Sequence, residues 1–501
     1  MMILNAAVEA NKIIAQTLAN WIWSEDNERR IKNYKKYDEY YNGDHEVKIP
    51  PDIKDVVKDD FDVISNYCKT VVDKAVGYLC SSPISLEVVL DTFGFSEEQL
   101  AREREREKEA ERLLYRIYRR NEFLKKNIIK LIRILSKKGD VFIKCYVDET
   151  AGTEPEDKIK LKVLKPEIVF PKFRDDDYEE HEYIAIIYDR RDELGNIYKY
   201  AQVFWPDVIR EYKSEGGGRQ WVQIGEDKKN ELGMIPIVHI KNTEDELPWG
   251  RSDIEDVMSL QDAINKCLTD LLYNADYQAF QRIIVTGHSE PAQDDEGGIY
   301  RNRITKRKGI GAGTILCVPT PEAKVYIVEP ADSSRLIEII KTIRQEISAN
   351  GRVPQIALSQ ADGAGAASSL SLRIHYQPLD EKCNEKAALV ASGLQQLNRI
   401  IFELYKKMTK EDFTDMETDI RFSKSMPRDR KEEAEIQEIE DRNKWKSKET
   451  IRTERGIPDP EEEKEKILAE MEEYRDDLYG QRVEREIENL LGGAGEEEEE
   501  S

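Results

Sequence analysis

Acidic side chains are the most abundant groups in this chain that could do chemistry, and Asp175, Asp176 and Asp177 form a consecutive triplet. Neighbouring carboxylates can hold the two divalent cations of a nuclease, which stabilise the attacking and leaving oxygens of a phosphate ester. The chain holds 101 Asp and Glu residues, so closely spaced carboxylates arise in many places without any site. We therefore interpret the triplet as a solvated loop and keep a metal-dependent DNA-processing nuclease as an alternative.

Histidines are scarce. The chain holds five, all far apart in sequence: His45, His181, His239, His288 and His375. The first of them ends the stretch YYNGDH, residues 40–45. Tyr34, Tyr37 and Tyr41 recur at helical spacing, and Gly43 is the residue type that commonly ends a helix. A general base needs an orienting partner, and none is near in sequence. We predict that this stretch is a helix end and that His45 is hydrogen-bonded and not catalytic.

The usual sequence signatures of enzymes do not occur. The glycine-rich run DGAGAASS, residues 362–369, lacks the lysine of a phosphate-binding loop, and there is no HExxH, no GxSxG and no GxGxxG after a strand. The six cysteines form no CxxC pair, which disfavours a zinc knuckle or a disulfide framework and is typical of reduced thiols in a cytoplasm. We therefore expect no enzymatic activity, no cofactor and no metal.

The charge of the chain limits its contacts with nucleic acid. Asp and Glu number 101 against 77 Lys and Arg, a formal net charge of −24 over 501 residues. A protein that grips nucleic acid normally presents a basic face that releases counterions from phosphate. This chain is therefore expected either to avoid nucleic acid or to touch it without holding it. Residues 1–23 lack a basic leader and no apolar run is long enough to cross a bilayer, so we expect neither a signal peptide nor contact with a membrane.

Helical and β-rich segments must position whatever this chain binds. Residues 96–138 follow a helical pattern that ends at Gly139. Residues 141–242 contain short β-rich runs between acidic or glycine-rich turns, which predicts an α+β unit with an antiparallel sheet. Residues 252–278 carry one apolar stripe, and Ser252 and Glu255 have the spacing of a capping box at its start.

A small β insertion and a second long helix come next. Strand-like runs at residues 282–287, 313–318 and 324–330 border a loop with five cations, Arg301, Arg303, Lys306, Arg307 and Lys308. The helix predicted at residues 332–351 has two faces. Its apolar face holds Leu336, Ile337, Ile340, Ile343 and Ile347, and its polar face holds Glu338, Lys341, Arg344 and Gln345.

The segment after this helix, residues 352–369, is small, polar and rich in Gly and Ala, which predicts a mobile loop that packs no core of its own. A third helix is predicted at about residues 370–408, with a kink at Pro378. Residues 411–491 are charged and helical in pattern, and the run GGAGEEEEES after them is typical of a disordered acidic tail.

The order of these elements resembles the portal proteins of tailed bacteriophages, most closely those of the long-tailed siphophages. Four stretches carry the resemblance: YYNGDH; NYCKTVVDKAVGYLCSSPI at residues 66–84; WGRSDIEDVMSLQDAINK at residues 249–266; and the helix, Gly/Ala loop, long helix order of residues 332–408. Together they span most of residues 30–410. The resemblance also implies that the YYNGDH corner belongs to a wing domain and has no chemistry.

The resemblance implies an α+β ring subunit with a defined order of parts. These are an α/β wing at residues 1–250, a first stem helix at 251–278, a β-containing clip at 279–331, a second stem helix at 332–350, a tunnel loop at 351–369, a long kinked helix at 370–410, a helical crown at 411–491 and a disordered acidic tail at 492–501. Two long amphipathic helices also need neighbours to cover their stripes, which favours an oligomer.

The implied function is a DNA channel, usually a ring of twelve subunits, at one vertex of the capsid. Duplex DNA would pass through it during genome packaging and ejection. Partners would be the terminase packaging motor, a head-completion or adaptor protein, and the scaffolding and major capsid proteins, with assembly in the host cytoplasm and a final place in the virion. A non-enzymatic helical scaffold remains a second alternative, although the β-rich middle disfavours sustained heptads.

Three sets of residues are the candidates for contact with DNA or partner proteins. The loop is expected either to contact DNA weakly inside the channel or to be a surface linker. In the first case Gln355, Ser359 and Gln360 would offer neutral hydrogen bonds to phosphate, Asp362 would keep the loop from sticking, and Gly363 and Gly365 would let the backbone change shape. The stem face Glu338, Lys341 and Arg344 is either solvated or in contact with phosphate. The five clip cations Arg301, Arg303, Lys306, Arg307 and Lys308 form either a docking surface for the motor or adaptor, or an ordinary exposed loop.

Overall fold

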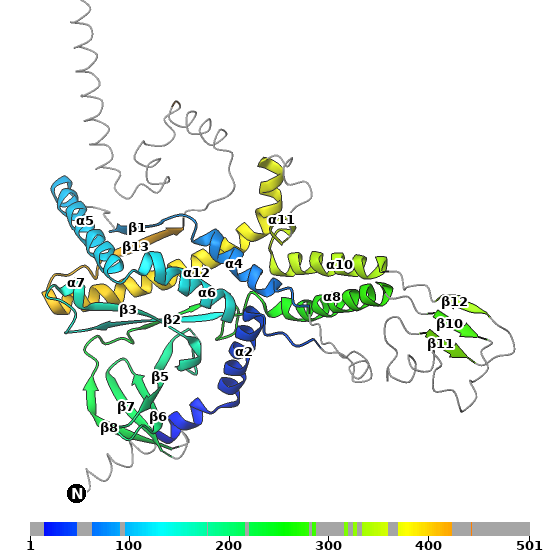
Figure 1. Cartoon of the computed structure of the whole chain (residues 1–501). Helices are drawn as coiled ribbons and strands as arrows, with labels where there is room; N and C mark the ends of the chain where they lie inside the picture. Colours follow the sequence, from blue (N-terminus) through cyan, green and yellow to red (C-terminus); the bar gives the residue numbers. More distant parts are fainter. Residues whose placement is uncertain are drawn as a thin grey trace, which may run out of the picture. The chain divides into compact units, whose positions relative to one another are not determined.

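The structure of the chain is a computed structural model that describes residues 15–47, 63–90, 96–177, 179–215, 220–279, 283–286, 315–318, 324–327, 333–358, 369–422 and 442. The chain divides into two compact units, and the smaller one comprises Ser82–Ser85 and Arg421–Ser501. The larger unit contains nearly all of the described helices and strands (Figure 1).

The N-terminal helices begin and end where local chemistry dictates. Helix α2 (Glu25–Asn42) starts at Ser24, whose side chain accepts a hydrogen bond from Asn27 N, and it ends at Gly43 in the left-handed conformation. Helix α4 (Tyr67–Leu79) starts at Asn66, whose side chain accepts from Lys69 N. The predicted helix end in YYNGDH is therefore confirmed.

The helical pattern of residues 96–138 forms two helices joined by a short π-helix. A capping box between Ser96 and Gln99 starts α5 (Glu97–Arg120), and the π-helix Phe123–Asn127 leads into α6 (Ile128–Lys138). Gly139 ends α6 with a φ of 87°, as the sequence predicted. The break falls at Asn121 and Glu122, and Glu122 has a φ of 48°.

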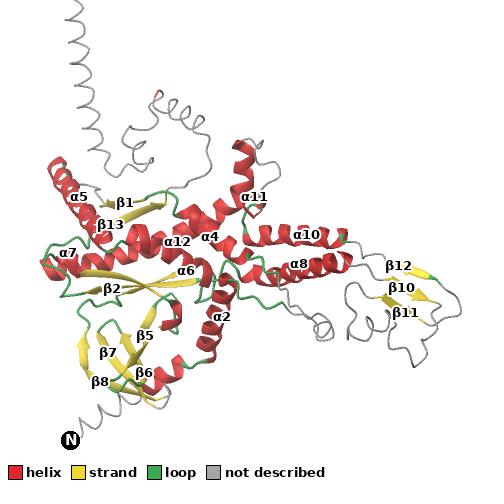
Figure 2. Cartoon of the chain, in the orientation of Figure 1, coloured by secondary structure: helices red, strands yellow, loops and turns green. Residues whose placement is uncertain are grey.

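The β-rich middle forms two antiparallel sheets where the sequence predicted one (Figure 2). The first has the order β3-β2-β9, with β2 at Asp140–Val147, β3 at Ile159–Leu164 and β9 at Ile237–Lys241. The second has the order β4-β5-β6-β7-β8, with β4 at Val169–Phe173, β5 at His181–Arg191, β6 at Ile197–Phe204, β7 at Val208–Glu215 and β8 at Gln220–Lys229. Helix α7 (Pro155–Lys158) and the 3₁₀ turn Pro166–Ile168 flank β3.

Both faces of β5 are buried, which explains why its sequence reads as a continuous apolar run. Ala185 and Ile187 pack in one core cluster with Leu18 and Ile22 from the helix that precedes α2. Ile186, on the opposite face, packs in a second cluster with residues such as Phe142 of the first sheet. The second sheet therefore lies between the N-terminal helical segment and the three-stranded sheet.

The helix predicted at residues 252–278 begins later than predicted. Helix α8 (Met258–Ala279) follows a 3₁₀ turn at Glu255–Val257, and Ser252 forms no capping box. Instead Ser252 Oγ donates to Lys137 O at 2.6 Å, because the start of this segment packs against the end of α6. The side chain thus joins two elements that lie 115 residues apart in sequence.

The β insertion between the two long helices α8 and α10 has the strands that the sequence predicted. Strand β10 (Ile283–Thr286) pairs in parallel with β11 (Ile315–Val318) and antiparallel with β12 (Val325–Ile327). Helix α10 (Ser334–Gly351) then returns along α8. Ile340 and Ile347 are buried as predicted, whereas Ile337 is 44% exposed, so its predicted inward position is wrong within a single chain.

The predicted loop after α10 begins with ordered structure. Gly351 is the last residue of α10 and is buried, Val353 is 1% exposed, and Gln355–Leu358 form the short helix α11. Helix α12 (Ser369–Thr409) matches the predicted third helix and contains Pro378, and its ribbon bends near its N-terminal end (Figure 1). The pattern after residue 411, predicted as helical, contains strand β13 (Glu417–Phe422), which pairs with β1 (Ile84–Val89).

Candidate functional site

The structure describes four of the residues that the sequence singled out. Glu338, Lys341 and Arg344 are exposed on α10, where they make no ion pair within the described residues, and Gln355 is exposed on α11. The other candidates lie outside the described residues, namely Ser359, Gln360, Asp362, Gly363 and Gly365 of the loop and Arg301, Arg303, Lys306, Arg307 and Lys308 of the clip. The described candidates thus form a solvated helix face in the single chain.

A row of buried polar side chains on α8 was not predicted from the sequence. Gln261, Asn265 and Thr269 recur every four residues and are at most 1% exposed. Gln261 Oε1 accepts from Tyr67 N at 2.8 Å, Asn265 Oδ1 from Ser65 N at 3.1 Å, and Thr269 Oγ1 from Val63 N at 3.1 Å. Tyr67 N is the first N–H of α4 and has no partner inside the helix, whereas Ser65 and Val63 precede α4. The row therefore binds the start of α4 and the segment that leads into it. The sequence pattern that could have predicted this row is the spacing of four between polar residues that lie beside an apolar stripe.

His45 is held by two hydrogen bonds from its own surroundings. Its Nε2 lies 2.9 Å from Tyr40 O, and its Nδ1 lies 3.0 Å from Asn265 Nδ2. A carbonyl only accepts, so Nε2 carries the proton and Nδ1 accepts from the amide. Tyr40 OH in turn donates to Asp262 of α8 at 2.8 Å. The interpretation of His45 as a hydrogen-bonded structural residue is confirmed, and it joins the end of α2 to α8.

The carboxylate of Asp140 joins α2, β9 and the segment that leads into α8. Asp140 is fully buried, and its Oδ1 accepts from His239 Nε2 at 2.8 Å and from Gly250 N at 3.0 Å. Its Oδ2 accepts from Tyr34 OH at 2.5 Å. Burial, followed by the nearby charge of Asp140, raises the pKa of Tyr34 well above its ordinary value, so the phenol remains a donor.

Next to Asp140 in the fold, the ring of Trp249 packs against side chains of α2 and β4. The guanidinium carbon of Arg30 lies 4.1 Å from the centre of the Trp249 ring, and Phe173 meets that ring edge-on at 5.3 Å between centres. Arg30 Nη2 also donates to Val169 O at 2.9 Å. Trp249 and Gly250 therefore hold α2 and β4 against the segment that leads into α8.

A buried ionic cluster joins α12 to the segment before α8 and to the end of α10. Asp253 Oδ2 lies 2.6 Å from Lys386 Nζ and 3.3 Å from Lys382 Nζ, and its Oδ1 accepts from Asn242 Nδ2 at 2.9 Å. Lys382 Nζ also donates to Gly351 O at 3.1 Å, at the end of α10. Burial opposes ionisation of Asp253, but the two ammonium groups and the hydrogen bonds outweigh it and hold its pKa at about 2.

His181 gives the fold a predicted sensitivity to acid. Burial, and then the neighbouring His239 and Lys241, lower the pKa of His181 from 6.5 to about 3, and its Nε2 has no hydrogen-bond partner among the described residues. The unfolded chain takes up this proton as the pH falls through 6.5, whereas the folded chain does so only near 3. The contribution of neutral His181 is therefore complete above pH 6.5 and is lost progressively below it.

We expect the free energy of unfolding to fall by about 2 kcal/mol between pH 7 and pH 5 through this residue, at about 1.4 kcal/mol for each pH unit below 6.5. His181→Phe preserves the ring packing on Phe173. This variant should lack the fall in unfolding free energy that His181 causes between pH 7 and pH 5, as measured by chemical denaturation at both pH values. His375→Phe, at an exposed position of α12, controls for the loss of a histidine. An unchanged pH dependence in His181→Phe would refute the assignment.

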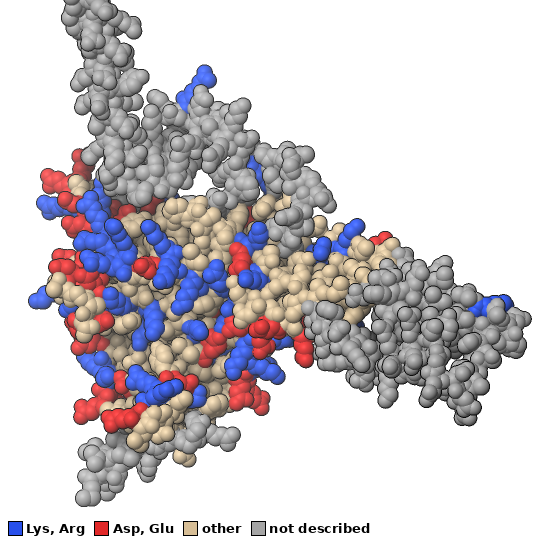
Figure 3. Space-filling view, in the orientation of Figure 1, with Lys and Arg blue, Asp and Glu red and all other residues tan. Residues whose placement is uncertain are grey.

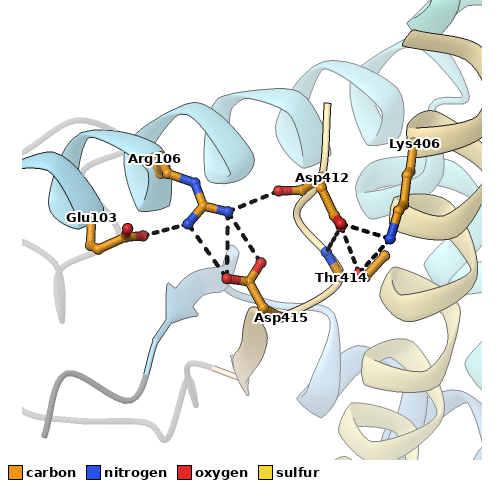
Figure 4. A network of polar contacts seen from close by, with 6 residues as sticks. All are labelled: Glu103, Arg106, Lys406, Asp412, Thr414 and Asp415. Carbon is orange, nitrogen blue, oxygen red and sulfur yellow. Dashed lines mark hydrogen bonds and ion pairs between the residues drawn. The ribbon is translucent and has the colours of Figure 1, made fainter. Parts of the chain in front are cut away.

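A second, exposed ionic network ties α5 to the turn after α12 (Figure 4). Arg106 of α5 donates to Asp412 O at 2.9 Å and pairs with Asp415 at 3.2 Å and with Glu103 at 2.6 Å. Lys406 Nζ lies 2.6 Å from Asp412, and this hydrogen bond, with those from Thr414, lowers the pKa of Asp412 to about 2. Exposed pairs of this kind contribute little to stability, so the network orients the turn more than it holds the fold.

The described side chains offer structural contacts and no assembled reaction centre. In the acidic triplet, Asp175 pairs with Lys172 and Asp176 with Arg174, and these carboxylates are exposed. No group of three or more His, Cys, Asp or Glu residues in the described part of the chain could hold a metal ion. None of the described helices combines the length and apolarity needed to span a membrane.

Comparison with known proteins places these features in a family. The family model described as "Phage portal protein, SPP1 Gp6-like" matches residues 21–477. The match includes the corner at His45, Trp249, the buried row on α8 and the whole of α12. No curated protein matches the chain.

Proposed function

Because the chain belongs to the family of phage portal proteins, it functions as a phage portal, and we propose that its subunits close into a ring of twelve around a channel for duplex DNA. The match over residues 21–477 is the observation that carries this conclusion. The family is structural and non-enzymatic, and it places the protein in an oligomeric ring at the capsid vertex of the virion. No observation favours the nuclease or the helical scaffold.

The surface of α10 supports a ring over a two-fold dimer. Ile337 and Ile339 are 44% and 46% exposed, and two residues along a helix differ by about 200° in direction. Apolar side chains thus point to opposite sides of the same helix. A closed ring uses two different patches on each subunit, one for each neighbour, whereas a two-fold dimer uses one patch twice. We propose that the two isoleucines meet different neighbours.

Ile337→Glu and Ile339→Glu should therefore each impair assembly, because both patches are needed in every interface of a ring. Burial of apolar area of this size contributes at least about 1 kcal/mol, so we expect at least roughly a fivefold rise in the concentration for half-assembly. Light scattering at micromolar concentration measures this. Glu338→Gln, between them, is the matched control and should assemble normally. A wild-type chain that stays monomeric would contradict the ring itself.

We propose an order of parts within the subunit. Residues 1–250 form the wing, 251–278 and 332–350 the stem helices, 279–331 the clip, 351–369 the tunnel loop, 370–410 the long helix, 411–491 the crown and 492–501 the acidic tail. The antiparallel contact of α8 with α10 around a small sheet supports the stem and clip assignments. The start of the tunnel loop is anchored through Gly351 and Lys382, which leaves the remainder to reach DNA.

The partners are proposed from the same function. Duplex DNA passes the channel, and the acidic chain with a net charge of −24 would repel it from the walls while exposed cations such as Lys341 and Arg344 slow it. The five clip cations Arg301, Arg303, Lys306, Arg307 and Lys308 would dock the terminase motor and the head-completion protein. Scaffolding and major capsid proteins would contact the subunit during assembly in the host cytoplasm.

A further inference from the structure

One stretch of this acidic chain has the opposite charge. Between Arg112 and Lys138 there is a single acidic residue, Glu122, and there are ten basic ones: Arg112, Arg116, Arg119, Arg120, Lys125, Lys126, Lys130, Arg133, Lys137 and Lys138. The stretch covers the second half of α5, the π-helix and α6. Figure 3 shows Lys and Arg gathered over this region of the surface.

Several of these cations are neutralised by neighbouring carboxylates. Arg116 pairs with Glu156 and Arg120 with Asp157, both from α7. The other pairs are Lys126 with Glu122, Arg133 with Asp73, Lys137 with Asp38, and Lys138 with Asp38 and Glu167. Four side chains remain exposed and make no ion pair within the described residues: Arg112, Arg119, Lys125 and Lys130. We call these four the free strip.

The geometry of the free strip suits an extended polyanion. Arg112 and Arg119 are seven residues apart, which places them on one face of α5 about 10 Å apart along the axis. Lys125 and Lys130 follow along the chain, in the π-helix and in α6, after the break at Asn121 and Glu122. At physiological salt the screening length is about 8 Å, so the distant carboxylates of the chain do not cancel a local cluster.

We propose that the free strip binds the phosphate backbone of duplex DNA, without sequence preference and outside the channel. The described residues include no exposed large apolar side chain between Arg112 and Lys138, whereas protein-docking sites are built around such anchors. Arginine presents a planar fork that matches phosphate. The inference rests on the portal function only in that this function brings the protein and packaged DNA together.

The test uses covalently closed circular plasmid, which cannot thread a closed ring and so reports on outer contacts alone. Four phosphate contacts give a log–log salt slope of about −3.6, which is about a 150-fold loss of affinity between 50 and 200 mM salt. The variant Arg112→Ser, Arg119→Ser, Lys125→Ser, Lys130→Ser should bind plasmid weakly and lose most of this slope. Binding is measured on the full-length protein by filter retention.

The matched control removes four other exposed cations, Arg29, Arg174, Lys199 and Lys228, and so changes the net charge equally. It should bind plasmid as the unchanged protein does. If both variants lose plasmid affinity equally, net charge causes the effect and the proposal is wrong. If the strip variant binds plasmid as tightly as the unchanged protein, the proposal is also wrong. If the strip variant instead binds plasmid normally but loses an acidic virion protein, the surface docks protein and the DNA assignment is wrong. Light scattering on the same samples reports ring formation separately, so a failure of the ring is distinguishable from a failure of the strip.

Discussion

Gly250→Ala is expected to prevent the chain from folding to a soluble form. An added Cβ at this position would lie 2.2 Å from Gly139 O and 2.7 Å from Asn242 N, and neither backbone group can turn away as a flexible side chain could. Gly139 O already accepts from Asn242 N at 2.8 Å, and Gly250 N donates to buried Asp140. Relief of the clash would break these hydrogen bonds at the junction of α6, β2 and the stem, at a cost above about 4 kcal/mol.

Gly77→Ala is the matched control for this substitution. Gly77 is exposed within α4, and nothing lies within 4 Å of an added Cβ. Alanine is favoured over glycine in a helix interior, so this variant should be unchanged or more stable by up to about 1 kcal/mol. Soluble yield and thermal unfolding by circular dichroism compare the two. A soluble Gly250→Ala protein with an unfolding temperature close to the parent would show that the two backbone segments are not in contact.

Asp253→Leu is expected to lower the free energy of unfolding by about 3–5 kcal/mol, because it leaves two buried ammonium groups without their anion. Lys386 is 1% exposed, and Lys382 is held between Asp253 and the carbonyl of Gly351. Burial already lowers the pKa of Lys382, and the charge of Asp253 opposes that shift. Denaturant unfolding at one fixed protein concentration measures the loss.

Two further variants separate a buried charge from a general defect. Asp415→Leu breaks a pair whose carboxylate is 50% exposed (Figure 4), so it should cost no more than about 1 kcal/mol. Asp253→Leu combined with Lys382→Met and Lys386→Met removes all three charges and should recover most of the loss, since apolar replacements of a buried ion cluster are often tolerated. If the triple variant is as unstable as Asp253→Leu alone, unpaired charge is not the cause.

Helix α10 shows what hydrophobic periodicity can predict and what it cannot. Its residues recur with a helical period, and the helix forms at Ser334–Gly351 as predicted. Periodicity also assigned Ile337 to the covered side, yet this residue is 44% exposed in the single chain. A helical repeat in the sequence shows which side chains point to the same face of the helix. How many of them are buried depends on the size of the element that packs against that face. Here α8 covers only part of the helix.

Long-range hydrogen bonding determined where α8 begins. Ser252 and Glu255 have the spacing of a capping box, but Ser252 Oγ donates to the carbonyl of Lys137, and α8 starts only at Met258. Gln261 also forms long-range hydrogen bonds, since its partners Tyr67 and Cys68 precede it by more than 190 residues. A local sequence pattern predicts a hydrogen bond between a polar side chain and a group a few residues away. In the folded chain the same side chain is buried and forms its hydrogen bond with a group that is distant in sequence.

Features that depend on neighbours along the chain could be predicted before the fold was known. These are the helix ends at Gly43 and Gly139, the alternating strands of the middle, the net charge of −24, and the order of motifs that resembles the portal family. The contacts between distant groups became visible only in the folded chain: Asp253 with Lys386, Asp140 with His239, and Gly139 with Gly250. Local signals reflect backbone sterics and spacing, which are encoded within a few residues. The partner of a buried charge or of a close backbone approach is fixed only when the chain has packed, because many residues of the right type compete for each place.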